Sequence, residues 1–282
     1  MKISEIKDKL FNKNNLQKNE SSFLFNLILE GSLSDIDIAS ILIALKIKEE
    51  TKDEIIGAVS VLRNKSLKIK APSNCVDTCG TGGDMSGTLN ISTSAALIAA
   101  SAGVNIAKHG NRSISSKSGS ADMLEMLGYK IKSQSKDLEK SIKDFNFCFM
   151  FAQYHHSAMK NVINVRRNLG TRTIFNLLGP LTNPASAKRQ ILGVFDKKWI
   201  NVHCEVLKDL GSEKAMVVHG EDGLDEISLC SKTLIAELID NKIKYYTFNP
   251  VDYGYDFIDK KDILGKDPEY NAKAFLKVLE AP

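Results

Sequence analysis

The sequence of 282 residues is poor in several residue types, and each scarcity excludes a class of protein. It has five cysteines, an odd number at low density, so we expect reduced thiols in a cytoplasm and no disulfide framework. The longest run of small apolar residues, 95–107, is interrupted by Ser101, Gly103 and Asn105 and is too short to span a bilayer. The N-terminus carries frequent charges without an apolar stretch, so we expect no signal peptide.

Arginine is scarce as well, and net charge is low. Only six of the 38 basic residues are arginine, and four of these six lie in the segments singled out below. Where lysine is the common surface cation, an arginine is more often present for its planar, forked geometry. The net charge of +4 is too small to indicate a nucleic-acid partner. With 43% hydrophobic and 26% charged residues, the composition is that of a globular protein.

The pattern of apolar residues divides the chain into two regions. Residues 1–70 predict only helices, which we place at 23–30, 36–46 after the capping Ser34, and 52–63. After Ala71-Pro72-Ser73, short apolar runs alternate with helical patterns through residue 282, which favours a mainly parallel sheet flanked by helices. We therefore predict an α/β protein with a small all-helical N-terminal domain, 1–70, and a large α/β domain, 71–282. The strands are expected at 75–77, 104–107, 147–151, 190–195 and 215–218, and the helices of the large domain at 93–102, 121–127 and 200–210.

A glycine-rich segment follows the first predicted strand. It reads Asp77-Thr78-Cys79-Gly80-Thr81-Gly82-Gly83-Asp84 and continues to Ser92, Thr93 and Ser94 at the start of a helix. Glycines without Cβ atoms and a helix N-terminus together offer free N–H groups to a phosphate or pyrophosphate. The segment is neither a Walker loop nor a GxGxxG fingerprint. A tight turn with an ordinary serine N-cap is the alternative.

A second polar segment, 108–122, follows the second predicted strand and begins Lys108-His109-Gly110-Asn111-Arg112-Ser113. It combines cations, a histidine, an asparagine and several hydroxyl groups, which could surround a polyanion at the carboxyl end of a strand. A solvated serine-rich loop is the alternative, although such a loop has no need for Lys108, His109, Asn111 and Arg112 in close succession.

An acidic segment, Asp222-Gly223-Leu224-Asp225-Glu226, follows the strand predicted at 215–218. Adjacent carboxylates at a strand end suit Mg²⁺, which commonly bridges carboxylates and substrate phosphates. Taken alone, the segment is better explained as an acidic turn.

The segment 164–184 contains three of the six arginines. Arg166 or Arg167 could form a forked pair with a substrate carboxylate, and a surface helix with salt-bridged arginines is the alternative. Among the histidines, we expect His155 and His156 to form a surface pair at a helix start, and His203 to be structural. No GxSxG sequence indicates a serine nucleophile.

Read together, these segments resemble the anthranilate phosphoribosyltransferase family. The resemblance rests on five strings in the family's order: 80–84, 90–93, 108–122, 172–184 and Asp225-Glu226. It implies a transferase that uses 5-phosphoribosyl 1-pyrophosphate (PRPP), anthranilate and Mg²⁺ in tryptophan biosynthesis and forms a homodimer through its helical domain. It also implies that a segment near 165–185 returns to the helical domain. Family members usually continue well past a segment like 267–280, so we expect the large domain to be C-terminally incomplete.

The resemblance also assigns expected roles to residues. The PRPP-binding set comprises Gly80, Gly83, Asp84, Thr88, Asn90, Ile91, Ser92, Thr93, Lys108, His109, Gly110, Asn111, Arg112, Ser113, Ile114, Ser115, Ser116 and Ser120. The anthranilate-binding set comprises Gly80, Asn111 and Arg166, and the metal ligands are Ser92, Asp225 and Glu226. Lys108 is expected to stabilise the leaving pyrophosphate, and His109 is a hypothetical acceptor of the amine proton.

Two other functions stay open at this point. A pyrimidine nucleoside phosphorylase of the related class shares looser versions of the two polar loops, although Arg166 and the 172–184 string argue against it. A non-enzymatic relative that binds nucleic acid would need a strong basic stripe, which the charge pattern does not supply.

Overall fold

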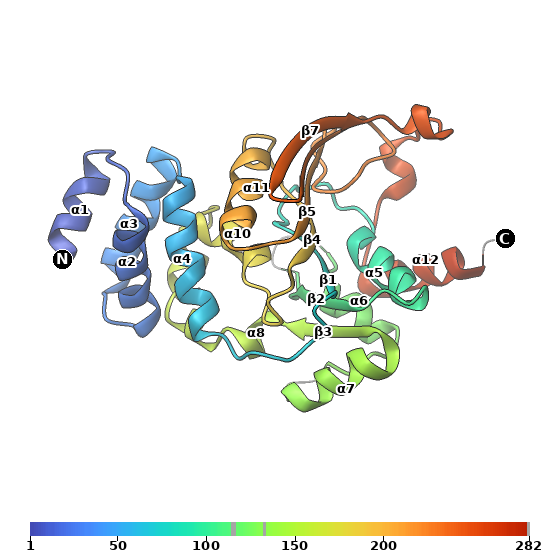
Figure 1. The fold of residues 1–282 in the computed structure, drawn as a ribbon, viewed down its shortest axis with the longest axis horizontal. Helices are drawn as coiled ribbons and strands as arrows, with labels where there is room; N and C mark the ends of the chain where they lie inside the picture. The colour runs from blue at the N-terminus through green and yellow to red at the C-terminus, as the bar shows by residue number, and fades with distance from the viewer. Residues whose placement is uncertain (114–116, 132–133, 281–282) are drawn as a thin grey trace.

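The computed structural model describes residues 1–113, 117–131 and 134–280. Four helices come first: α1 (Ile3–Phe11), α2 (Lys18–Glu30), α3 (Asp35–Lys48) and α4 (Lys52–Lys65). Their ends follow local chemistry, since the Ser34 hydroxyl accepts the Asp37 N–H at 3.2 Å and Gly31 ends α2 in the left-handed region, with φ +74°. The four helices gather at one end of the molecule (Figure 1). The all-helical start predicted from the sequence is confirmed.

A seven-stranded sheet forms the rest of the core, in the order β3-β2-β1-β4-β5-β6-β7. The pairs among strands β1 to β5 are parallel. The last two pairs, β5 with β6 and β6 with β7, are antiparallel. The mainly parallel sheet is thus confirmed. The strands are β1 (Val76–Gly80), β2 (Ile106–Gly110), β3 (Phe147–Phe151), β4 (Arg189–Gly193), β5 (Lys214–Gly220), β6 (Thr233–Ile239) and β7 (Lys242–Phe248). The sequence did not predict β6 or β7.

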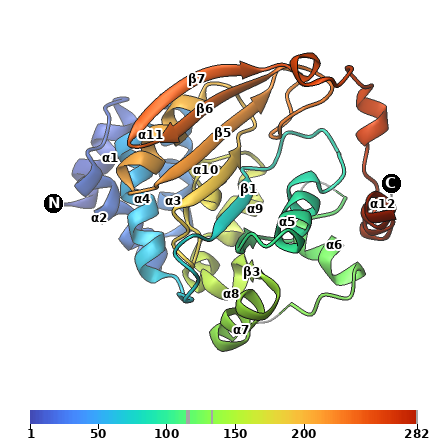
Figure 2. The same cartoon turned by 45° about the vertical axis from the view of Figure 1, so that its right-hand side comes forward.

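Helices cover the two faces of the sheet (Figure 2). On one face, apolar residues of α5 and α6 pack against Ile106 and the alternate residues Phe147, Phe149 and Phe151. On the other face, α7 packs against Cys148 and Met150. All five residues of β3 are buried, as its unbroken apolar sequence predicted. The elements after β1 that are not strands are α5 (Ile91–Ser101), α6 (Ser120–Met126), α7 (Ser135–Phe145), α8 (Ala152–His155), η1 (Ser157–Asn161), α9 (Ile163–Leu169), α10 (Ile174–Leu178), η2 (Gly179–Leu181), α11 (Trp199–Asp209), η3 (Pro250–Tyr253), η4 (Lys260–Ile263) and α12 (Pro268–Glu280).

One apolar core joins the first four helices to the sheet. It runs through α9, α10 and α11 to the inner residues of β4, β5 and β6. Phe25 of α2 meets Phe175 of α10 edge to face, with 5.7 Å between ring centroids. The 163–178 segment therefore packs with the helices of the N-terminal end while the chain on either side of it belongs to the sheet. Among the described residues, no helix combines the length and apolarity needed to cross a bilayer.

The order of the strands reverses direction at β1. The chain runs outward from β1 through β2 to β3, and then returns to the opposite side of β1 with β4. In open α/β sheets, ligands bind outside the carboxyl ends of the strands at such a switch point. The glycine-rich segment follows β1 and the acidic segment follows β5, so the fold brings both to this edge.

Candidate active site

The glycine-rich loop after β1 is shaped by a distant carboxylate. Gly82 and Gly83 adopt φ values of +64° and +76°, which glycine tolerates without steric cost. The Gly82 N–H donates to Asp225 Oδ2 at 2.8 Å. A Cβ atom on Gly80 would lie 2.5 Å from that same oxygen, so only glycine at position 80 leaves room for Asp225. The predicted loop and the predicted acidic segment therefore meet.

The residues of the acidic segment make two kinds of contact. Asp222 closes its own turn, accepting the Ser228 hydroxyl at 2.8 Å. Glu226 instead reaches the first turn of α5, where its Oε1 accepts the Ser92 N–H at 3.2 Å. Burial, with Asp84 nearby, raises the pKa of Asp225, and burial together with Asp225 raises the pKa of Glu226 to about 8. Neighbouring carboxylates that are shielded from water favour the binding of a cation between them.

The donor set fits Mg²⁺, which prefers oxygen ligands and usually keeps open positions for water and substrate. Ser92, Asp225 and Glu226 bring a hydroxyl and two carboxylates to one place. Among the described residues, no three His, Cys, Asp or Glu side chains converge in the way a dedicated metal cage requires. A magnesium ion held here would complete its shell with oxygens of water and of a substrate.

Lys108 lies in a strand and not in the loop where the sequence placed it. Lys108 and His109 are part of β2, and the Lys108 side chain is 1% exposed. Its ammonium donates to the Thr78 carbonyl and lies 3.3 Å from the Thr78 hydroxyl and 3.5 Å from Ser92 Oγ. A buried cation thus lies between β1 and the first turn of α5, beside the proposed metal ligands.

The buried lysine bridges a local opening of the sheet. β1 and β2 share only one register pair, Val76 with Ile106, and separate beyond it. Side chains replace the missing ladder bonds, since Asp77 Oδ1 accepts the His109 N–H at 3.0 Å and the Lys108 ammonium reaches across to β1. The opening lets a long side chain cross from one strand to its neighbour's carboxyl end.

His109 of β2 and two histidines after β3, His155 and His156, are all buried. The His109 and His156 rings meet edge to face, with centroids 5.1 Å apart. Both rings are buried, and each interacts with a backbone group, that of Gly179 for His109 and that of Thr182 for His156. Burial, reinforced by the neighbouring His156, lowers the pKa of His109 well below its usual value, so its imidazole is neutral. The prediction that His155 and His156 form a surface pair is wrong: both are buried, and His155 Nδ1 lies 2.7 Å from the Leu67 carbonyl. The sequence around these two histidines did not indicate that they would be buried.

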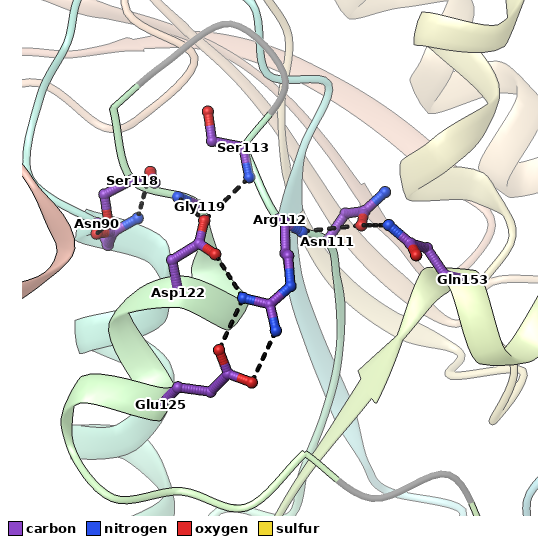
Figure 3. Close-up of polar contacts among 9 residues, drawn as sticks. All are labelled: Asn90, Asn111, Arg112, Ser113, Ser118, Gly119, Asp122, Glu125 and Gln153. Carbon is purple, nitrogen blue, oxygen red and sulfur yellow. Dashed lines mark hydrogen bonds and ion pairs between the residues drawn. The ribbon is translucent and has the colours of Figure 1, made fainter. Parts of the chain in front are cut away.

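The loop after β2 is anchored by Arg112 and Asp122 (Figure 3). The Arg112 guanidinium binds Asp122 at 2.8 Å and both carboxylate oxygens of Glu125 at 2.7 and 2.8 Å. Asp122 Oδ2 also accepts the N–H groups of Ser113 and Gly119 at 3.1 and 2.9 Å. The arginine therefore ties the loop to α6. Three residues predicted to bind PRPP, Ile114, Ser115 and Ser116, lie outside the described residues.

Asn90 joins the two polar loops. Its Nδ2 donates to the Ser118 carbonyl at 3.2 Å and its Oδ1 accepts the Ser118 hydroxyl at 3.1 Å (Figure 3). Asn111, on the other side of the second loop, accepts the Gln153 amide at 3.5 Å. Both asparagines were predicted site residues, and their contacts bring the segments after β1, β2 and β3 together.

The structure distinguishes the two adjacent arginines that the sequence left open. Arg166 of α9 is partly buried, with its guanidinium 5.4 Å from the centroid of the Phe175 ring, and burial lowers its pKa. Arg167 is exposed. A guanidinium held against a ring at the domain junction can present its fork to a planar carboxylate, whereas an exposed one is typical of a surface helix.

Arg172 was part of a matching string but was assigned no role. Its guanidinium donates to the Gly83 carbonyl and stacks 4.3 Å from the centroid of the Phe195 ring. The Phe195 N–H in turn donates to the Thr81 hydroxyl at 3.0 Å. Arg172 therefore holds the outer side of the glycine-rich loop. The scarcity of arginine in this lysine-rich chain was the one available signal.

The helical bundle and the α/β domain are the two domains of the glycosyl transferase family. The helical bundle domain of the glycosyl transferase family matches residues 4–66, and the a/b domain of that family matches residues 72–282. An anthranilate phosphoribosyltransferase of Thermoanaerobacter sp. (strain X514) is 46% identical over 99% of this chain and 82% of its own. That of Azorhizobium caulinodans is 49% identical over 94% of this chain and 77% of its own. The chain belongs to the anthranilate phosphoribosyltransferase family.

Solved structures agree with this assignment. The anthranilate phosphoribosyltransferase of Thermus thermophilus is 37% identical and superimposes with a TM-score of 0.91 over 97% of this chain and 82% of its own. The Saccharomyces cerevisiae enzyme in complex with PRPP and Mg is 28% identical, with a TM-score of 0.88 over 96% of this chain and 79% of its own. The same yeast enzyme has been solved with 4-fluoroanthranilate.

Proposed function

We propose that this protein transfers the phosphoribosyl group of PRPP to the amine of anthranilate, giving N-(5-phosphoribosyl)anthranilate and pyrophosphate. The observation that carries the proposal is the pair of partly buried carboxylates, Asp225 and Glu226, at the glycine-rich loop and the N-terminus of α5. Carboxylates beside a phosphate cradle fit a substrate that brings phosphates and a divalent cation together. The relatives named above favour this function over a nucleoside phosphorylase.

The PRPP site lies along the carboxyl ends of β1 and β2. The Gly82 and Ser92 N–H groups already donate to Asp225 and Glu226. The N–H groups of Gly83 and Thr93 would be offered to the pyrophosphate, the first from a loop without Cβ obstruction and the second from the first turn of a helix. Ser92, Asp225 and Glu226 would hold Mg²⁺, which would neutralise charge on the leaving pyrophosphate. We assign the remaining contacts to the predicted set, namely Gly80, Gly83, Asp84, Thr88, Asn90, Ile91, Thr93, Lys108, His109, Gly110, Asn111, Arg112, Ser113 and Ser120, together with residues 114–116.

Anthranilate would lie on the side of the helical bundle. Arg166 would bind its carboxylate, with Gly80 and Asn111 beside the ring. The neutral His109 imidazole meets the His156 ring edge to face, with 5.1 Å between centroids. It can accept the proton that the amine loses when the new C–N bond forms.

The reaction needs no protein nucleophile. Pyrophosphate leaves C1 of the ribose through an oxocarbenium-like state, and the amine attacks that carbon. The Lys108 ammonium and the N–H groups of the glycine-rich loop stabilise the charge that develops on the leaving group. Holding both substrates in line supplies a large part of the remaining acceleration.

The test is the decay of anthranilate fluorescence in a mixture of the protein, PRPP and Mg²⁺. We expect decay only when all three are present. Calorimetry then separates the other outcomes: PRPP binding without decay would limit the defect to turnover, whereas no PRPP binding would refute the proposal. Phosphorolysis of a pyrimidine nucleoside by orthophosphate would favour the alternative. The homodimer and the cytoplasmic location stay predictions, the first of which light scattering measures.

A further inference from the structure

The segment before α12 runs alongside the glycine-rich loop. The Leu89 N–H donates to the Ile263 carbonyl at 2.9 Å, and the Gly265 N–H donates to the Gly87 carbonyl at 2.8 Å. Thr88 and Leu264 form an antiparallel bridge between these two bonds. A stretch far along the chain is therefore hydrogen-bonded to the approach of α5, which carries the Ser92 turn.

The α12 helix then packs across both helices that follow the polar loops. Ala272 and Phe275 form a buried cluster with Met123 of α6, and Leu97 of α5 and Leu127 pack against it. Figure 1 shows α12 beside α5 and α6 at the end of the molecule opposite the helical bundle. The helix is thus placed where it can fix the relative positions of the two loops.

Asn271 connects this helix to the proposed site. It is 2% exposed, its Nδ2 donates to Asn90 Oδ1 at 2.9 Å, and its Oδ1 accepts the Lys266 N–H at 2.9 Å. Asn90 in turn holds Ser118 of the second loop. A chain of contacts therefore runs from the start of α12 through the residue before α5 to the second loop.

The orientation of both amides is fixed by the ends of this chain. The Lys266 N–H is only a donor, so Asn271 must turn its oxygen toward it and its NH₂ toward Asn90. Asn90 then presents its oxygen to Asn271 and its NH₂ to the Ser118 carbonyl, which is only an acceptor. Each member of the chain is satisfied in one arrangement, and a flipped amide would oppose like groups.

We propose that Asn271 is a positioning residue for the phosphoribosyl pyrophosphate site, acting through Asn90. It touches neither substrate nor metal. By fixing the Asn90 amide, it holds the glycine-rich loop, the first turn of α5 and the second loop at the separation that a pyrophosphate between them requires. This inference rests on the proposed function, because the ligand it serves is PRPP.

The sharpest perturbation is Asn271→Asp. Aspartate keeps the oxygen that accepts the Lys266 N–H but replaces the NH₂ with a second oxygen, which opposes Asn90 Oδ1. Asn90 must then either lose that contact or flip and lose Ser118. Asn271→Ala is the second variant, because it removes the amide without burying a charge, should the aspartate prevent folding.

The matched control is Phe275→Leu, which loosens the packing of α12 without touching the amide chain. For Asn271→Asp we expect the KM for PRPP to rise about tenfold or more, as for a lost buried hydrogen bond, with the KM for anthranilate nearly unchanged. At an equal loss of Tm, Phe275→Leu should leave the KM for PRPP within about twofold. Equal effects of the two variants, or an unchanged KM in Asn271→Asp, would overturn the proposal.

Hydrogen–deuterium exchange without substrate provides a readout that does not need activity. We expect faster exchange in residues 87–94 and 117–121 of Asn271→Asp than in Phe275→Leu, because only the first variant breaks the contact between the loops. Unchanged exchange in both loops would refute the positioning role even if the wild-type protein proved unable to bind PRPP. Failure of the wild type to bind PRPP would refute the proposed function separately.

Discussion

Removal of the Arg172 side chain tests whether the glycine-rich loop is held in place before substrate arrives. The guanidinium donates to the Gly83 carbonyl of the loop and lies against the Phe195 ring, 4.3 Å from its centroid. A Cβ atom on Gly83 would lie 3.3 Å from Arg172 Nε, so the loop and the arginine are in close contact. Arg172→Ala therefore releases the outer side of the loop and leaves the Gly82–Asp225 hydrogen bond on its inner side.

The size of the effect follows from two interactions. A hydrogen bond from a charged donor is worth roughly 1.5–3 kcal/mol. A guanidinium over an aromatic ring adds about 0.5–1 kcal/mol when it is partly exposed. In Arg172→Ala, part of the PRPP binding energy must order the loop that the arginine no longer holds. If this costs about 2 kcal/mol, the KM for PRPP rises about thirtyfold, because each factor of ten corresponds to about 1.4 kcal/mol. Arg172→Lys keeps the charge but loses the planar stacking, so we expect an intermediate value.

The assay is initial-rate kinetics with either substrate varied, and the matched control is the exposed Arg167→Ala. We expect the KM for PRPP to rise in Arg172→Ala, while that for anthranilate stays within about twofold and Arg167→Ala resembles the wild type. An unchanged KM for PRPP in Arg172→Ala would refute the reasoning, and so would an equal rise in the Arg167 variant.

Three further predictions concern substitutions of single residues. Arg166→Lys keeps the charge but loses the fork, so the KM for anthranilate should rise about tenfold with that for PRPP unchanged; equal changes in both constants would count against a carboxylate site. Gly80→Ala forces a Cβ to within 2.5 Å of Asp225 Oδ2, so Mg²⁺-dependent activity should fall at least about tenfold, and a full-activity variant would contradict this geometry. Burial lowers the pKa of His203 in the folded protein to about 4. As the pH drops below 6.5, His203 is therefore protonated in the unfolded chain before it is protonated in the folded protein. The free energy of unfolding should fall by up to about 3 kcal/mol between pH 6.5 and pH 4. Urea unfolding of His203→Gln across this range should show a shallower dependence on pH than the wild type, and parallel curves would show that His203 is not the cause.

The elements that the sequence predicted well are those with local causes. The helices of the first 70 residues have their own caps, such as Ser34 and Gly31, and these caps work within one turn of the chain. The β3 strand is apolar at every position because both of its faces are covered, and it spans the predicted residues 147–151. Strand β7 escaped prediction because it is largely exposed and mixes lysine and tyrosine with its apolar residues.

The features that the sequence did not predict depend on partners far away in the chain. Nothing near Lys108 indicates that β1 and β2 separate and let its side chain cross to the Thr78 carbonyl. Likewise His156 is buried by contact with His109 of another strand. Arg172 lies between two short helices and Asn271 in the first turn of α12, and only the folded chain brings their side chains to the two loops. Local patterns thus predicted where the chain would form loops, but not which residues would hold those loops.

The distribution of charge at the strand ends decides which form of PRPP the site can accept. The described carboxyl groups around the glycine-rich loop include Asp77, Asp84, Asp225 and Glu226, and the ammonium of Lys108 acts on Asp77 and Glu226. Burial, and after it the repulsion from a neighbouring carboxylate, raises the pKa values of Asp225 and Glu226, so the ionised forms of these two groups are incompletely compensated by cations in the protein alone. Pyrophosphate alone would add to that repulsion, whereas a magnesium complex of PRPP would relieve it. We therefore expect calorimetry to detect PRPP binding with Mg²⁺ and to find it at least about tenfold weaker when the cation is chelated, and equal affinity in both conditions would show that the carboxylates do not face the substrate.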